Sequence, residues 1–353
     1  MNLAIKSIYA QLEAANIDGL LISLPANISY LTEINSRDAY LLVSKKENIY
    51  FADSRYTQEL KKNLNQAFTL EKINGSVFKL IADTFGRLGL KRVGFEERYL
   101  VCGEYKNIKK ELKKAIDLIP THSLVEGLRE IKTPAELQKI RKATRITIDA
   151  LRFIRDFISP GRKEIEVAAE LERFIRYRGA ATSAFNIIVA SGPNSSFPHH
   201  ITSQRKIKNN EPVLIDIGVD YLGYKSDLTR VFFLGTMETI LEKIYNIVLK
   251  AQQEAIKKIK PGVRINKIDK AARRYIAQRG YGRFFCHNLG HGIGLEVHEE
   301  PNISAREENR LRPAMVFSIE PGIYLPNRFG VRIEDLVLVT PEGVELLSDN
   351  LDK

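Results

Sequence analysis

The stretch Val213-Leu-Ile-Asp-Ile-Gly218 places a carboxylate, Asp216, in the middle of an apolar run rich in β-branched residues. Such a run predicts a buried strand, and a carboxylate buried there is costly unless a cation neutralises it. Asp227 lies eleven residues further on, at the start of a second apolar run. If the loop between the runs centres on Tyr221 and Leu222, the two aspartates lie directly opposite each other on an antiparallel pair of strands.

A second pair of acidic residues, Glu320 and Glu334, lies in the same kind of sequence further along the chain. His291 precedes this pair, in a glycine-rich segment where the backbone can come close to a metal ion. Four carboxylates and one imidazole form an oxygen-rich ligand set that suits Mn²⁺, Co²⁺ or Fe²⁺, with Zn²⁺ as a further alternative. The sequence therefore predicts two divalent metal ions, held by Asp216, Asp227, His291, Glu320 and Glu334.

Histidines gather beside these acidic strands. Five of the six histidines in the chain lie in two short segments, one with His199 and His200 and the other with His287, His291 and His298. A lone histidine is usually an ordinary polar residue, but this grouping favours a role in catalysis or in substrate binding.

Arg332 lies two residues before Glu334, so both side chains point to the same face if the segment is one strand. The pattern leaves two interpretations open. Arg332 either neutralises Glu334 within the protein or binds a carboxylate of the substrate.

The composition is that of an ordinary globular protein. The 353 residues exceed the size at which one core usually stops growing, about 250–300 residues, so two domains are expected. No apolar run approaches the ~18 residues of a membrane span, and the first residues do not resemble a signal peptide, so we expect a cytoplasmic location. The two cysteines lie far apart and outside a CxxC motif, which is typical of free thiols in a reducing compartment.

The net charge of +11 raises the question of nucleic-acid binding. The basic residues, however, are interspersed with acidic ones, and no basic stretch alternates with aromatic residues. No helix-turn-helix or RNA-binding motif is present either. We therefore expect neither a nucleic acid nor a membrane as a partner.

Residues 1–121 alternate predicted strands and helices and lack a cluster of catalytic residue types. The character of the chain changes before Thr133-Pro-Ala-Glu136, a capping box with proline at the first helical position. This motif begins a long amphipathic helix that ends near Ile158. We therefore predict two domains, 1–121 and 122–353.

The second domain contains a faint internal repeat. The segments 158–179 and 259–280 align at an offset of 101 residues, each with Pro-Gly near its start and Arg-Gly at its end. Each segment reads as a turn and a helix, and each precedes histidines and then two acidic strands. Chance similarity between amphipathic helices would also explain the match. The parallel placement of the acidic strands favours a duplication, with the carboxylates meeting at a pseudo-two-fold axis.

Five motifs together resemble the pita-bread metallopeptidases, which include methionine aminopeptidase, aminopeptidase P, prolidase and the metal-free creatinase. The motifs are Ser191-Gly-Pro-Asn-Ser-Ser-Phe-Pro-His199, Leu214-Ile-Asp-Ile-Gly218 with Tyr224-Lys-Ser-Asp-Leu-Thr-Arg230, Gly290-His-Gly-Ile-Gly-Leu-Glu-Val-His-Glu299, Ser318-Ile-Glu-Pro-Gly322 and Gly330-Val-Arg-Ile-Glu-Asp335. The resemblance implies an α+β fold. A catalytic pita-bread domain with a pseudo-two-fold repeat, 122–353, would follow a smaller creatinase-type α/β domain, 1–121.

The resemblance also implies the reaction. All five metal-ligand positions of the family are filled, unlike in creatinase. Because methionine aminopeptidases usually lack the amino-terminal domain, the resemblance favours hydrolysis of the bond between a first residue and proline. The imide of such a bond has no N–H and a fixed φ, so a dedicated pocket is plausible. A hydroxide bridging two metal ions, most readily Mn²⁺, would attack the carbonyl while Glu320 relays a proton.

The resemblance further assigns roles to single residues. Asp227 and Glu334 would bridge the two ions, Asp216 would hold one of them, and His291 with Glu320 would hold the other. His199 and His298 would stabilise the oxyanion and position the proline, and His287 with Arg332 would bind the substrate beyond the scissile bond.

Several alternatives stay open on the sequence. Another amino-terminal specificity, such as methionine removal, and a non-catalytic peptide-binding role both occur within the family. The sequence does not decide between a dipeptidase and an aminopeptidase for longer peptides. A homodimer is implied only by the resemblance.

Overall fold

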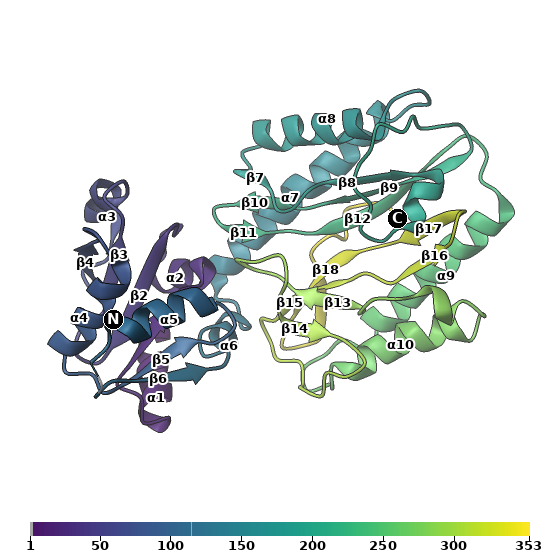
Figure 1. The fold of residues 1–353 in the computed structure, drawn as a ribbon. Coiled ribbons are helices and arrows are strands. Elements are labelled where there is room, and N and C mark those ends of the chain that lie inside the picture. The colour runs from purple at the N-terminus through teal and green to yellow at the C-terminus, as the bar shows by residue number, and fades with distance from the viewer. Residues whose placement is uncertain (1–2, 114) are drawn as a thin grey trace. The chain divides into compact units, whose positions relative to one another are not determined.

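The computed structural model describes residues 3–113 and 115–353 (Figure 1). Contacts divide the chain into two compact units, Met1–Arg129 and Glu130–Lys353. The sequence placed the boundary between residues 121 and 122. The short helix α6 (Glu126–Arg129) belongs instead with the first unit, because Val125 and Leu128 pack into the apolar core of that unit.

The first unit is a mixed six-stranded sheet between two apolar layers, with strand order β4-β3-β2-β1-β5-β6. Side chains of β1 alternate between the layers. Leu20 and Ile22 share one cluster with residues of α1 and α2, whereas Leu21 shares the other with residues of α4 and α5. The elements before α6 are α1 (Leu3–Ala14), β1 (Gly19–Ile22), α2 (Pro25–Thr32), β2 (Ala39–Ser44), β3 (Ile49–Ala52), α3 (Thr57–Asn63), β4 (Thr69–Lys72), α4 (Val77–Arg87), β5 (Arg92–Glu96), α5 (Cys102–Glu111) and β6 (Asp117–Thr121).

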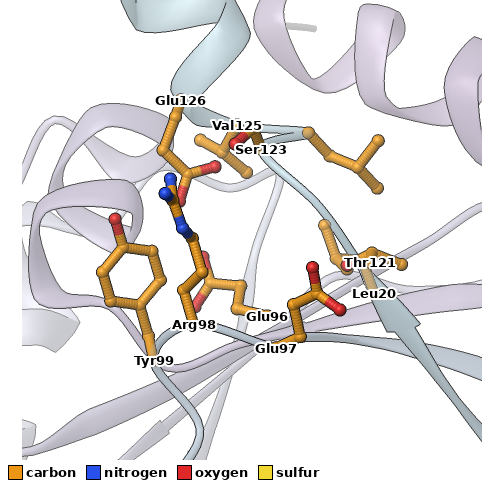
Figure 2. A pocket seen from close by; sticks show the side chains of 10 residues that line it. Leu20, Glu96, Glu97, Arg98, Tyr99, Thr121, Ser123, Val125 and Glu126 are labelled. Atoms are coloured by element: carbon orange, nitrogen blue, oxygen red, sulfur yellow. The ribbon is translucent and has the colours of Figure 1, made fainter. Parts of the chain in front are cut away.

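A small pocket in the first unit is lined by side chains that include Glu96, Arg98 and Glu126 (Figure 2). Glu96 is almost fully buried and accepts hydrogen bonds from Leu24 N at 2.7 Å and Asn27 Nδ2 at 2.6 Å. These bonds fix the start of α2, where backbone N–H groups lack partners within the helix. We therefore interpret Glu96 as a structural carboxylate.

The second unit contains the predicted long helix and most of the remaining strands. Thr133 and Glu136 form the predicted capping box, with Thr133 N donating to Glu136 Oε2 at 2.8 Å. The helix that follows is α7 (Pro134–Phe157), which ends one residue before Ile158.

Two sheets of the second unit, β12-β9-β8 and β14-β13-β15-β18-β19, form its main antiparallel layers. The other elements are α8 (Glu164–Tyr177), β7 (Thr182–Ser183), β8 (Ile188–Ser191), η1 (Gly192–Ser196), β9 (Glu211–Ile217), β10 (Val219–Tyr221), β11 (Tyr224–Lys225), β12 (Leu228–Leu234), α9 (Thr239–Ile256), α10 (Asn266–Ala277), η2 (Gly282–Phe284), β13 (Gly290–Gly292), β14 (Glu299–Ile303), β15 (Val316–Ile319), β16 (Gly322–Leu325), β17 (Phe329–Arg332), β18 (Asp335–Val339) and β19 (Val344–Leu346).

The internal repeat predicted from the sequence has matching contacts in the two halves of the second unit. In the first half, Lys163 forms an isolated antiparallel bridge with Lys206, just before α8. In the second half, Arg264 forms the same kind of bridge with Arg310, just before α10. Each half thus uses the turn after Pro-Gly to join a helix to a later segment of the same half, and these matching contacts favour duplication over chance.

Two further observations concern the chain as a whole. Among the described residues, every helix is too short or too polar to span a membrane. Cys102 and Cys286 are both free thiols, as the sequence predicted, and both are exposed.

Candidate metal centre

The four predicted acidic ligands lie at or beside strands of the two main sheets. Asp216 is in β9, Asp227 directly precedes β12, Glu320 directly follows β15, and Glu334 directly precedes β18. The register of β15 and β18 places Glu320 and Glu334 across from each other, one step beyond the last paired residues. Strand ends from both halves of the repeat therefore supply the acidic residues.

The predicted opposition of Asp216 and Asp227 is wrong, because the observed partner of Asp216 lies two residues further along the chain. Asp216 pairs with Thr229, because the hairpin turn centres on Leu222 and Gly223, one residue later than predicted. Both turn residues have positive φ, 51° and 86°. A two-residue hairpin turn with the favoured twist requires this geometry, which glycine adopts without strain. Asp227 therefore reaches the site from just outside the paired part of the strands.

His291 lies in β13 and meets acidic residues from both halves. Its Nε2 atom is 3.3 Å from Glu320 Oε1 and 3.6 Å from Asp227 Oδ2. One ligand atom each of Asp227, His291 and Glu334 lie within 4.8 Å of one another. Burial, followed by the neighbouring His298, lowers the pKa of His291 to about 4. The imidazole is therefore neutral at pH 7, which is the form that binds a metal ion.

The carboxylates carry more negative charge than their surroundings neutralise. Burial, and then repulsion by Glu334, raises the pKa of Asp227 well above its usual range. Burial, and then repulsion by Glu320, does the same for Glu334. Burial raises the pKa of Glu320 to about 8, even though Arg332 opposes the shift. Carboxylates crowded in this way are stable as anions only when further positive charge is added.

Three buried carboxylate oxygens indicate where added positive charge would bind. Asp216 Oδ1, Asp227 Oδ1 and Glu334 Oε1 are buried and have no hydrogen-bond partner among the described residues. Buried polar atoms of proteins are nearly always paired, so such oxygens call for a ligand. Carboxylate oxygens with a neutral imidazole form a donor set that suits a divalent transition metal. The residues present therefore fit the predicted metal ions.

Arg332 is buried, and each of its three side-chain nitrogen atoms donates a hydrogen bond within the protein. Its Nη2 atom donates to Asp216 Oδ2 at 2.6 Å, and its Nε atom donates to Thr229 Oγ1 at 3.0 Å. Its Nη1 atom donates to Tyr324 OH at 2.9 Å. The sequence suggested Glu334 as its acidic partner, but the direct ion pair is with Asp216. Arg332 is the last residue of β17, so the strand alternation that we assumed between it and Glu334 ends before Glu334.

Tyr324 and Thr229 lie at this centre as well, although neither was predicted from the sequence. Tyr324 OH lies 2.9 Å from His287 Nε2, and Thr229 Oγ1 donates to Glu334 Oε2 at 2.7 Å. Strands β16 and β17 pair with Tyr324 opposite Gly330, two residues from Arg332, so the side chains of Tyr324 and Arg332 share one face. Finding Tyr324 required the register of that hairpin.

The remaining predicted histidines lie around the ligands. The ring of His298 stands edge-on to the ring of His291, with centroids 4.3 Å apart. Burial, followed by nearby His199, lowers the pKa of His298. His287 lies 4.0 Å from Glu320, and burial followed by Arg332 lowers its pKa to about 4. His199 and His298 are exposed to solvent.

Comparisons with known proteins place the chain in a family. The profile of Metallopeptidase family M24 matches residues 138–341, and that of the Creatinase/Prolidase N-terminal domain matches residues 5–131. The Xaa-Pro dipeptidase of Pyrococcus horikoshii is 36% identical over 355 residues, which cover 99% of this chain and 97% of the relative. The chain therefore belongs to metallopeptidase family M24, and the predicted family is confirmed.

Solved structures extend the similarity to the whole fold. An Xaa-Pro dipeptidase from Bacillus anthracis superposes with a TM-score of 0.95 at 38% identity, covering 99% of this chain and 98% of the other. An X-Pro aminopeptidase from Thermotoga maritima superposes with a TM-score of 0.87 at 35% identity, covering 94% of this chain and 96% of the other. These matches confirm the predicted fold class, a creatinase-type domain followed by the metallopeptidase domain.

Proposed function

We propose that this protein hydrolyses the peptide bond between an amino-terminal residue and proline. The observation that carries the proposal is the set of buried carboxylate oxygens of Asp216, Asp227 and Glu334, which lack partners among the described residues beside neutral His291. Relatives that match nearly the whole chain are named Xaa-Pro dipeptidase, which supports the choice of substrate.

We propose that two divalent ions, most readily Mn²⁺, occupy the centre. Asp227 and Glu334 would bind both ions, Asp216 would bind one, and His291 with Glu320 the other. When bound, such ions acidify water and polarise a carbonyl group. Co²⁺, Fe²⁺ and Zn²⁺ are the alternatives for the same ligands.

Side chains of the protein itself carry out the remaining steps of the reaction. Water adds to the carbonyl carbon, and the bond from that carbon to the proline nitrogen breaks. Glu320, ionised when the metal ions supply positive charge, accepts a proton from water on a carboxylate oxygen and returns it to the proline nitrogen. His298 and His199 donate hydrogen bonds to the oxyanion of the tetrahedral intermediate.

His287 and Arg332 act on the far side of the scissile bond. Tyr324 OH joins them, at 2.9 Å from each. Because the donors of Arg332 are bonded within the protein, we propose that it acts on the substrate through Tyr324 and His287 while it also holds Asp216 in place. His287 is neutral at pH 7, so it presents a hydrogen-bonding group without a charge.

A peptide panel tests the proposed reaction. The purified protein with Mn²⁺ is expected to cleave Ala-Pro, to leave Ala-Ala intact, and to lose activity with a chelator. Efficient cleavage of Met-Ala-Ser would favour the methionine-removing alternative. No cleavage of any peptide by protein shown to contain metal would favour the peptide-binding alternative.

Dipeptides are the substrates that we propose first. The X-Pro aminopeptidase from Thermotoga maritima is also similar over most of the chain, so longer peptides form the second candidate class. Comparing kcat/KM for Ala-Pro and Ala-Pro-Ala-Ala separates the two. A dipeptidase is expected to prefer Ala-Pro by a large factor, and an aminopeptidase is not.

We also propose a cytoplasmic homodimer. The free surface thiols Cys102 and Cys286 support the reducing compartment, and family membership supports the dimer. Light scattering of the purified protein measures its mass against the 40.1 kDa of one chain. A monomeric mass would contradict the dimer and leave the proposed reaction unaffected.

A further inference from the structure

The segment 191–203 carries His199 on the surface, and many of its contacts with the body of the protein converge on one buried carboxylate, Glu164. Glu164 is the first residue of α8, and its side chain is 0% exposed. It does not touch the five predicted metal ligands in any recorded contact. Its role is therefore separate from metal binding.

Six donor groups of this segment converge on the two oxygens of Glu164. Oε1 accepts from Ser191 N at 2.8 Å, from Ser191 Oγ at 2.7 Å and from Asn194 Nδ2 at 3.0 Å. Oε2 accepts from Ser203 N at 3.1 Å and from Ser203 Oγ at 2.6 Å. His200 Nε2 lies 2.9 Å from Oε2 and must be the donor, because an ionised carboxylate can only accept.

The same segment contacts the metal centre on its other side. Pro198 O accepts from Arg332 Nη1 at 3.2 Å, and Ser195 Oγ accepts from Gly330 N at 2.9 Å. His199 therefore lies between two anchored neighbours, because Pro198 is bound by Arg332 of β17 and His200 is bound to Glu164 of α8. Six hydrogen bonds donated to one carboxylate restrict the position of such a short segment far more than the covalent chain alone does.

We propose that Glu164 is a positioning residue that sets the place of His199 against the reacting carbonyl. The inference rests on the proposed function, because it gives His199 the oxyanion-stabilising role. A glutamine at 164 would keep the size of the side chain but would turn an N–H group toward donors of the segment. The segment would then withdraw, and His199 with it.

The second half of the repeat contains a comparable arrangement, which supports the inference and supplies a control. Asp269 of α10 is fully buried and accepts from Leu289 N at 3.2 Å. It also binds Arg273, whose Nη2 atom donates to His287 O at 2.9 Å. In each half, then, a buried acid near the start of the helix holds the segment that carries a site histidine. Asp269 acts on His287 rather than on His199.

Single and double variants of the full chain test the inference on Ala-Pro. Glu164→Gln is expected to lower kcat by about tenfold to a hundredfold, since small displacements of a catalytic group cost that much, with little change in KM. The decisive comparison is with His199→Ala: the Glu164→Gln/His199→Ala double variant is expected to match His199→Ala alone. Asp269→Asn combined with His199→Ala is expected to show the product of the two losses.

Glu170→Gln on the same helix is the matched charge control, because Glu170 bonds only to Arg173 in the recorded contacts. It is expected to retain wild-type kinetics. Bound metal, measured by elemental analysis, is expected to stay at the wild-type level in Glu164→Gln. If that variant fails to fold, Ser203→Ala, which removes one of the six donors, replaces it and is expected to give a smaller loss in kcat.

Three outcomes would overturn the inference: wild-type kcat in a folded Glu164→Gln, loss of its bound metal, or losses that multiply in the Glu164→Gln/His199→Ala double variant. Each of these requires an active wild type. An inactive, metal-loaded wild type would instead contradict the proposed function.

Discussion

Glu334 joins the two halves of the metal centre through one side chain. Its Oε2 atom accepts from Thr229 Oγ1 in the first half, and its Oε1 atom is buried without a partner among the described residues. We expect Glu334→Gln to lose metal and activity together, because an amide supplies neither the charge nor a second free acceptor. Mutating a residue that only hydrogen-bonds to a metal ligand already lowers metal affinity by about 10- to 100-fold. Replacing a ligand itself should therefore lower the affinity by more than about a hundredfold. Titration with Mn²⁺ measures this change.

Glu342→Gln is the control for this prediction, because Glu342 is an exposed carboxylate of the same half. It is expected to leave metal binding unchanged. Wild-type affinity for Mn²⁺ in Glu334→Gln would remove this residue from the ligand set.

Gly290 lets β13 approach β15 closely enough to present His291. A Cβ atom at Gly290 would lie 1.9 Å from Ser318 O, a backbone atom that cannot move aside alone. We expect Gly290→Ala to lower both thermal stability and metal affinity, because the strands would have to separate beside the ligand. Gly343→Ala, whose added Cβ would meet nothing within 4 Å, is expected to lower neither. Equal melting temperatures for the two variants would contradict the packing argument.

At the residue scale, the four acidic residues were predicted as ligands because each is a charged side chain in an apolar run, and His291 because it lies in a glycine-rich segment. Asp216 and His291 could be selected without any knowledge of the fold. Tyr324 and Thr229 could not, because tyrosine and threonine are ordinary residues of strands. Their roles follow from which atoms face them, and that depends on register.

At the scale of elements, the stability of the segment held by Glu164 should depend on pH. Burial raises the pKa of this carboxyl group, but hydrogen bonds from Ser203, Ser191 and His200 outweigh it and lower the pKa below the ordinary 4.5. Because the folded-state pKa lies below the unfolded one, the stabilisation is complete above about pH 4.5 and is lost as pH falls through the folded-state value. Thermal melts of wild type and Glu164→Gln should therefore differ most near pH 7 and converge below pH 4.5. A constant difference would show that the charge of Glu164 contributes nothing.

Local signals determined how well each element could be predicted. The capping box of Thr133 and Glu136 is contained in four adjacent residues, so it correctly marked the start of α7. The hairpin before β12 depends on which two residues adopt positive φ, and Gly223 takes the second place. A one-residue error in the place of the turn shifted the predicted partner of Asp216 by two residues, from Thr229 to Asp227, because a residue moved across a turn leaves one strand and joins the other.

For the whole molecule, bound metal should contribute directly to stability. A ligand that binds only the folded state raises the free energy of unfolding by about 2.7 kcal/mol when its concentration is 100 times its Kd. We expect Mn²⁺ to raise the melting temperature of the wild type and a chelator to lower it. Asp227→Asn, which alters a residue of the metal-ligand cluster, should lose most of this response. Equal responses in wild type and variant would place the stabilising ion elsewhere.

The sequence predicted that the molecule has two units, but it predicted the position of the boundary between them less accurately. Length and the change of residue pattern near Thr133 indicated a second domain. The few residues of α6 carry no signal of their own, and only the packing of Val125 and Leu128 assigns them to the first unit. Similarly, the repeat was visible in the sequence as Pro-Gly and Arg-Gly, whereas the bridges that match between halves required coordinates.

The paired placement of the acidic residues has a consequence for the origin of this fold. Asp227 and Glu334 occupy matching places in the two halves, each directly before a strand, and Asp216 and Glu320 both lie near the end of a strand that pairs with it. A half-length ancestor that associated as a symmetric pair would therefore already have gathered four carboxylates, before gene fusion made the halves one chain. Fusion would then have freed each copy to diverge, so that a ligand such as His291 needed to arise only once.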